Sequence, residues 1–143
     1  MRLLYVFFLY IISTNLAFSE PKNHGTLTVI VNSAQSNNGN IEVHILANQA
    51  QFDNEIPAFL ICRMIVKELK STCEFRNVPY GNYVIFAFHD RNLDQHLNTN
   101  FFEEPTEKMS ITGIDLAENS SPNFKSGLIL FNSMHGQVYM NLQ

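Results

Sequence analysis

The run from Tyr83 to His89 most constrains the fold, because it is apolar at both odd and even positions. Successive side chains of a β-strand point to opposite faces of its sheet. A strand that simply alternates has one wet face, whereas this run needs cover on both sides. Strands of that kind lie inside a layered structure and not at an edge. The run therefore predicts the central strand of a β-sandwich.

Shorter runs with a period of two surround this strand and are separated by polar or Pro/Gly turns. In one of them Glu42 and His44 alternate with apolar residues, which predicts that both face solvent or the open side of the sheet. About seven strands favour one all-β domain, an antiparallel β-sandwich of the immunoglobulin or transthyretin kind with one long loop. We expect the strands at Thr26–Asn32, Ile41–Ile45, two arms between Ala58 and Phe75, Tyr83–His89, Gly127–Phe131 and Gln137–Leu142.

Cys62 and Cys73 are the two cysteines of the chain. In an oxidising compartment an even count indicates a disulfide, and the competing interpretation, a zinc site, is not supported by this spacing. The two positions face each other in a hairpin centred between Lys67 and Glu68, where opposed residues lie about 4.5–5.5 Å apart. A helix also fits the apolar residues of 58–69, but the cysteine pair favours strands. We therefore predict a cross-strand disulfide.

The N-terminus carries the pattern of an export signal. Arg2 precedes the apolar run Leu3–Ile12, and Ala17-Phe18-Ser19 places small residues at a cleavage site before Glu20. The run is short for a membrane anchor, which needs roughly 20 apolar residues. We expect a signal peptide at 1–19 and a mature domain at 20–143 that does not span the membrane. This places the protein in the periplasm or outside the cell.

The charge of the chain limits its partners. The formal net charge is −4, and no cluster of Lys and Arg is visible. Binding to a phosphate backbone requires such a cluster, so nucleic acid is not an expected partner. We expect a monomer whose partner is an unidentified ligand of the cell envelope or the extracellular space.

Polar residues recur at every second position directly after the central strand, at the start of an irregular segment from Asp90 to Asn123. Calcium loops present oxygen ligands in this alternating way. Calcium is therefore the first ion that this loop suggests, although position six of the pattern is Gln95 and not Gly. Zinc bound by His89 and His96 with nearby aspartates is a second option. The third is a loop without an ion, in which Asp and Asn side chains hydrogen-bond the loop's own backbone. The tentative metal ligands are Asp90, Asn92, Asp94, His96 and Asn98.

With Gly81 and Tyr83, then His89-Asp90 and Asn92, and then Thr99-Asn100-Phe101, the segment from Tyr83 resembles DUF2141, a family of secreted bacterial proteins of unknown function. The resemblance implies a secreted β-sandwich and no established activity. Leu93 and Gln95 stand where the family has glycines, and Asn98 stands where it has an aspartate. The matching residues are Gly81, Tyr83, Phe88, His89, Asp90, Asn92, Leu97, Thr99, Asn100, Phe101, Pro105, Glu107, Pro122 and Phe124.

From these positions we expect a set of residues that organises the loop. Asp90 and Asn92 are expected to bond the loop's own amides, while Phe101 packs its far end onto the sandwich. The loop-organising set is His89, Asp90, Asn100, Phe101, Pro105 and Glu107.

No catalytic residues are predicted. Ser110 and Ser126 lie in no nucleophile motif, and both cysteines are assigned to the disulfide. His89 and Glu107 form an acid/base pair only in principle. We expect a non-enzymatic exported module for binding or for the cell envelope. The alternatives are a structural module stabilised by calcium at the 90–98 loop and, less favoured, a metal-dependent hydrolase.

Overall fold

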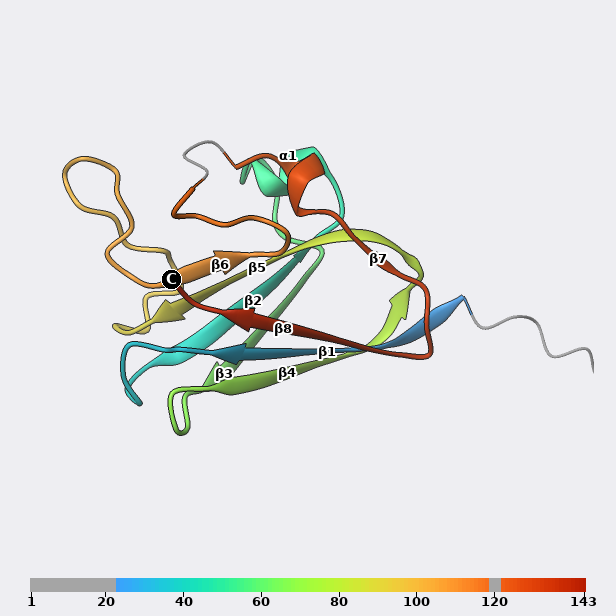
Figure 1. The fold of residues 1–143 in the computed structure, drawn as a ribbon, viewed down its shortest axis with the longest axis horizontal. Coiled ribbons are helices and arrows are strands. Elements are labelled where there is room, and N and C mark those ends of the chain that lie inside the picture. Colours follow the sequence, from blue (N-terminus) through green and yellow to red (C-terminus); the bar gives the residue numbers. More distant parts are fainter. Residues whose placement is uncertain (1–22, 119–121) are drawn as a thin grey trace, which may run out of the picture.

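The computed structural model describes residues 23–118 and 122–143, which form two facing β-sheets (Figure 1). The first sheet has the order β4-β1-β8, and the second has the order β3-β2-β5-β6, with β7 also paired to β5. The predicted signal peptide at 1–19 lies outside the described residues. The strands are β1 His24–Asn32, β2 Asn40–Leu46, β3 Leu60–Ile65, β4 Ser71–Pro79, β5 Gly81–Asp90, β6 Met109–Ile111, β7 Ile129–Phe131 and β8 His135–Asn141.

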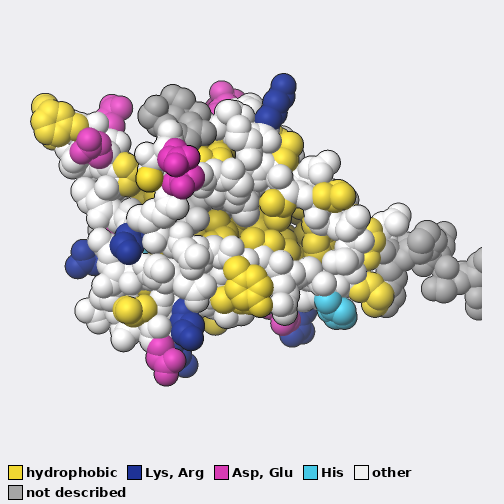
Figure 2. All heavy atoms as spheres, in the orientation of Figure 1, with side chains coloured by type: hydrophobic (Ala, Val, Ile, Leu, Met, Phe, Trp, Pro, Cys, Tyr) yellow, Lys and Arg dark blue, Asp and Glu magenta, His cyan; other side chains and the backbone are white. Residues whose placement is uncertain are grey.

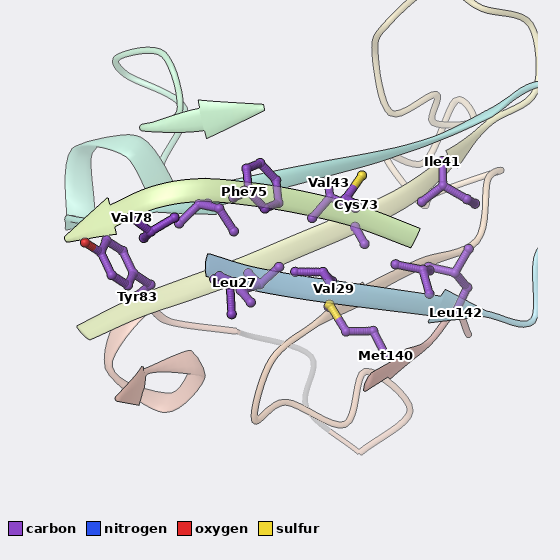
Figure 3. Close-up of a cluster of buried hydrophobic side chains, with 14 of the residues drawn as sticks. Leu27, Val29, Ile41, Val43, Cys73, Phe75, Val78, Tyr83, Met140 and Leu142 are labelled. Atoms are coloured by element: carbon purple, nitrogen blue, oxygen red, sulfur yellow. The ribbon is translucent and has the colours of Figure 1, made fainter. Parts of the chain in front are cut away.

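The all-β sandwich is confirmed, and its core follows the period-two pattern of the sequence. Leu27, Val29 and Val31 of β1 are buried against Ile41 and Val43 of β2 and further apolar side chains. Figure 3 shows side chains from β1, β2, β4 and β8 pointing toward one another between the two sheets. Burying this apolar surface is the main term that stabilises the fold.

The central position of β5 is also confirmed. Its pairing partners are β2 on one side and β6 and β7 on the other. Ile85 and Ala87 pack into the core between the sheets, while Val84 and Phe86 belong to a second apolar cluster on the outer face. That outer cluster includes residues of the one-turn helix α1 Gln49–Phe52 and of the 3-10 turn η1 Phe124–Gly127. Both faces of β5 are therefore covered, as its sequence requires.

The sandwich is not antiparallel throughout, which corrects part of the expectation. β1 and β8 run parallel, with Thr26 paired to His135 and Val31 paired to Met140. After β8, Gln143 exchanges two backbone hydrogen bonds with Met109 of β6, at 3.0 and 3.3 Å. These bonds join the edge of the first sheet to the edge of the second.

The disulfide between Cys62 and Cys73 is confirmed, but its predicted setting is wrong. β3 pairs with β2 in the second sheet and β4 pairs with β1 in the first, so the two cysteines do not face each other across one hairpin. Between β3 and β4, pairing in the described residues is limited to the Lys67–Lys70 bridge at the turn, and beyond it each strand pairs within its own sheet. The Cα atoms are 6.0 Å apart. The bond therefore joins the two sheets.

The 90–123 segment is less irregular than its sequence suggests, because it contains β6 and the bridge between Thr99 and Pro105. The expected strand at 127–131 is shorter, since Gly127 ends η1 and β7 begins at Ile129. Within the described ranges, no helix is long and apolar enough to cross a membrane.

Candidate functional site

His89 ends β5 and is completely buried. Its Nδ1 accepts a hydrogen bond from the amide of Gln35 at 3.0 Å, and its Nε2 donates to the carbonyl of Asn38 at 2.7 Å. Both ring nitrogens are thus used to hold the turn between β1 and β2. This arrangement serves the structure and leaves neither nitrogen for a metal ion.

Two buried carboxylates hold the loop that follows. Asp90 accepts the amides of Asp94 at 3.2 Å and of Gln95 at 3.0 Å, one on each oxygen. Glu107 accepts the amides of Arg91 at 2.8 Å and of Asn98 at 3.1 Å in the same way. Buried charges need such donors to offset their lost hydration. Together the two side chains fix both ends of residues 90–98.

The remaining tentative metal ligands bond one another. The Oδ2 of Asp94 accepts the side-chain amides of Asn92 at 2.8 Å and of Asn98 at 2.9 Å, and its Oδ1 accepts the amide of His96 at 2.9 Å. These hydrogen bonds, first that from Asn98, lower the pKa of Asp94. In the part of the chain that the structure describes, no three His, Cys, Asp or Glu side chains are grouped as metal ligands. The structure thus places Asn92, Asp94 and Asn98 side by side, with the carboxylate of Asp94 bonded to its neighbours.

The loop turns at Leu93 and Gln95, where the resemblance places glycines. Both residues have positive φ angles, 64° and 66°. This left-handed region costs a residue with a Cβ roughly 1–2 kcal/mol. The loop keeps its tight path, and the amide bonds to Asp90 hold it there.

Phe101 does not pack onto the sandwich, so that expectation is wrong. It is 94% exposed, its neighbour Phe102 is 78% exposed, and the two rings meet edge to face. Asn100 fixes this tip by accepting the amides of Phe102 and Glu104. Pro105 forms the bridge to Thr99 at its base. The tip projects from the body at the upper left of Figures 1 and 2, with a hydrophobic group at its end.

A different polar group lies on the outer face of the second sheet. Glu42 of β2 is completely buried, which corrects the expectation that it faces solvent. One of its carboxylate oxygens accepts from Nε of Arg63 on β3, and the other lies 2.9 Å from Nε2 of His44. Glu42 is buried because the outer side chains of β5 beside it and His44 are apolar and shield this face from solvent. The arginine supplies the charge that a buried carboxylate requires.

Next to this group lies a cavity of about 430 Å³, which we call the outer pocket. His44, Phe86 and Phe88 line it from the sheet, and the ring centroid of His44 is 5.8 Å from that of each phenylalanine. Edge-to-face contacts of this kind hold the imidazole in place. The remaining lining residues are Leu46, Gln51, Phe52, Asn54, Gln95, His96, Leu97, Met109, Ile111 and Pro122.

The sequence profile of a family described as uncharacterized proteins conserved in bacteria, DUF2141, matches residues 29–138. The chain belongs to this family. No curated protein and no solved structure matches the chain. The DUF2141 match runs from β1 into β8, so it includes the 90–98 loop and all the described lining residues of the outer pocket.

The DUF2141 domain has another, larger hollow of about 600 Å³ at the start of β1, lined by His24, Gly25, Thr26, Asn77, Met134 and His135. None of these residues is a buried polar group. The outer pocket differs because a buried carboxylate positions one of its lining side chains. We therefore take the outer pocket as the candidate site.

Reasoning from the sequence missed this pocket, its lining residue Phe86 and the ion pair of Glu42 and Arg63 beside it. A signal was present, because β5 is apolar on both faces and β2 is its neighbour. If the outer face of β5 is covered by other parts of the chain, the neighbouring residues Glu42 and His44 on β2 are shielded from solvent as well. A glutamate and a histidine two residues apart on such a strand predict a buried polar pair.

Proposed function

We propose that this DUF2141 protein is an exported, non-enzymatic binding module that holds a small ligand in the outer pocket. The observation that carries this proposal is the combination of an aromatic floor with a histidine fixed by a buried carboxylate. A cavity of about 430 Å³ is within the range of about 300–1,000 Å³ typical of small-molecule sites. Such sites are mostly apolar and use few polar groups to orient the ligand.

The chemistry of the lining supports binding over catalysis. Among the lining residues that the structure describes, the titratable side chains are His44 and His96. The Nδ1 of His96 contacts the carbonyl of Asp94 at 2.6 Å, and the side chain is exposed. Hydrolysis needs a nucleophile or an activated water beside an acid/base group. Among the described residues of the lining there is no Ser, Thr or Cys hydroxyl or thiol and no carboxylate.

Two features support export. The disulfide between Cys62 and Cys73 is of a type that persists in oxidising compartments and is rare in the cytosol. The first 19 residues have the composition of a signal peptide. Sequencing the N-terminus of the protein from culture medium or periplasm should find Glu20 as the first residue. Mature protein that retains Met1 would contradict export by this route.

Binding in the outer pocket can be tested by mapping the amide shifts of the oxidised protein during a titration with toluene. We expect the shifts to cluster at His44, Phe86 and Met109, whose side chains line the cavity. A Met109→Trp variant fills the pocket and should abolish them. Leu130→Trp is the matched control, because Leu130 on β7 is 65% exposed and does not line the pocket.

Scattered shifts, or shifts that survive in Met109→Trp, would contradict binding at this place. Circular dichroism of both tryptophan variants checks that each is folded. The chain contains no tryptophan of its own, so each variant also carries a single fluorophore that reports its surroundings.

A further inference from the structure

The tautomer of His44 follows from its partner. The carboxylate of Glu42 lies beside the permanently charged guanidinium of Arg63 and accepts hydrogen bonds on both oxygens. Because the carboxylate has no hydrogen to give, the Nε2 of His44 is the donor at 2.9 Å. The Nδ1 of the neutral ring then carries the lone pair and is an acceptor. A carboxylate that fixes a histidine tautomer in this way recurs in metal and catalytic sites.

This acceptor is unused in the described part of the chain, where Nδ1 of His44 has no hydrogen-bond partner. The ring nevertheless lines the outer pocket and is only 21% exposed. A positioned acceptor beside an apolar cavity favours a ligand that brings a donor. A ligand that has no donor displaces water from Nδ1 and leaves this acceptor without a hydrogen bond, which costs binding free energy.

The charge of the site disfavours ionic ligands. Glu42 is compensated by Arg63, so the pair presents no net charge to the cavity. None of the lining residues in the ranges that the structure describes is Lys, Arg, Asp or Glu. A charged ligand would lose its hydration and find no opposite charge there. A neutral ligand avoids this cost.

The shape of the floor favours a flat ring. Phe86 and Phe88 lie with their planes at 24° and their centroids 5.4 Å apart. Phe88 is 1% exposed, whereas Phe86 is only partly buried and presents its ring to the cavity. Aromatic rings gain from stacked and edge-to-face contacts beyond the area that they bury.

We propose that the outer pocket binds a neutral aromatic molecule with a hydroxyl group, a phenol in chemical class, whose hydroxyl donates to Nδ1 of His44 while its ring packs against Phe86. This inference rests on the proposed function, because it names the ligand class of the same site. His44 is the specificity-determining residue, and Glu42 is the positioning residue that holds its tautomer.

The test compares four probes on the oxidised protein by amide-shift titration: phenol, anisole, toluene and benzoate. Phenol should bind about 3–10-fold more tightly than anisole or toluene, the range expected from one added hydrogen bond. Anisole is the sharpest comparison, because it keeps the ring and the oxygen but cannot donate. Benzoate should bind more weakly than phenol.

Two variants test the role of His44. His44→Gln retains a donor for Glu42 but has no acceptor at the Nδ1 position, so it should bind phenol and anisole equally. His44→Phe should do the same if it folds. His135→Phe on β8 is the control, because His135 is exposed and lies away from the pocket. It should keep the preference for phenol.

The outcomes separate the two proposals. If none of the four probes shifts the pocket amides, the proposed function fails together with this inference. If toluene and phenol bind equally, or if His44→Gln keeps the full preference for phenol, the inference alone is overturned and binding at the pocket stands. Tighter binding of benzoate would overturn the preference for neutral ligands.

Discussion

The 90–98 loop and the outer pocket use similar residues for opposite purposes. In the loop, Asp90 and Glu107 each bond two backbone amides, and Asp94 is occupied by its neighbours. In the pocket, Glu42 is fully occupied as well, but it leaves one nitrogen of His44 unused at the wall of a cavity. The density of polar residues therefore does not locate the candidate site. A polar atom that is held in place beside apolar surface and has no hydrogen-bond partner in the protein is the better indicator of a binding site.

The largest expected effect comes from removing the disulfide, which ties β3 of the second sheet to β4 of the first. The double variant Cys62→Ala/Cys73→Ala should lose about 3 kcal/mol of unfolding free energy by the chain-entropy model. Cys62 lies on β3 beside Arg63, so amide exchange should accelerate in β3 next to the pocket and stay unchanged in the 90–98 loop. Denaturant unfolding and hydrogen exchange measure the two effects. Equal acceleration in β3 and in the 90–98 loop would show that the disulfide stabilises the whole fold and not β3 in particular.

Asp90→Ala should lower the unfolding free energy by about 2 kcal/mol. Two backbone amides lose a charged acceptor, and hydrogen bonds to water recover only part of the lost free energy. The loss should be the same with and without calcium, and calcium should raise the melting temperature of the native protein little. Thermal unfolding in calcium and in EDTA tests this. A large rise with calcium that disappears in Asp90→Ala would instead make the loop an ion site.

Glycine at Leu93 or Gln95 should stabilise the protein by about 0.5–1 kcal/mol. Relief of the left-handed conformation gives roughly 1–2 kcal/mol, and the greater freedom of glycine in the unfolded chain offsets about 0.5–1 kcal/mol of it. Gln95→Ala is the control, since it keeps a Cβ and should give no gain. A loss of stability in both glycine variants would show that the side chains contribute more than their φ angles cost.

The smallest effect concerns Asp94, whose lowered pKa comes first from the side chain of Asn98 and then from the amide of His96. A carboxylate whose folded pKa is lowered adds stability above its unfolded pKa, and this is lost as the pH falls through the folded pKa. Asn98→Ala should move the pKa of Asp94 up toward its ordinary value. Carboxyl chemical shifts followed from pH 7 downward measure this. An unchanged pKa would mean that the contact with Asn98 does not form in solution.

The strands were predictable because alternation and burial on both faces are local properties of the sequence. Residues 83–89 required two covered faces, and Leu27, Val29 and Val31 required one. Which strands pair with each other was harder to predict from the sequence. The register between Cys62 and Cys73 suggested one hairpin, but β3 pairs with β2 and β4 pairs with β1. The choice of partner depends on packing across the whole fold, which a local pattern does not contain.

The candidate site was predictable only in part, for a related reason. Asp90 and Asn92 stood out because polar residues cluster there, and the structure shows Asp90 bonding backbone amides. Glu42 was placed in solvent because alternation tells which residues share a face but not what covers that face. Phe101 was expected to be buried because it is large and apolar, yet the turn fixed by Asn100 directs it outward.

The parallel pairing of β1 with β8 also determines when the domain can finish folding. Thr26 pairs with His135, so β1 lacks a neighbour on one side until nearly the whole chain has been made. Contacts between residues so distant in sequence form slowly, because the chain must lose the conformational entropy of a long loop before the contact stabilises it. Until then β1 keeps an open edge that invites pairing with another chain. A nascent chain truncated before β8 should therefore stay open and prone to aggregate.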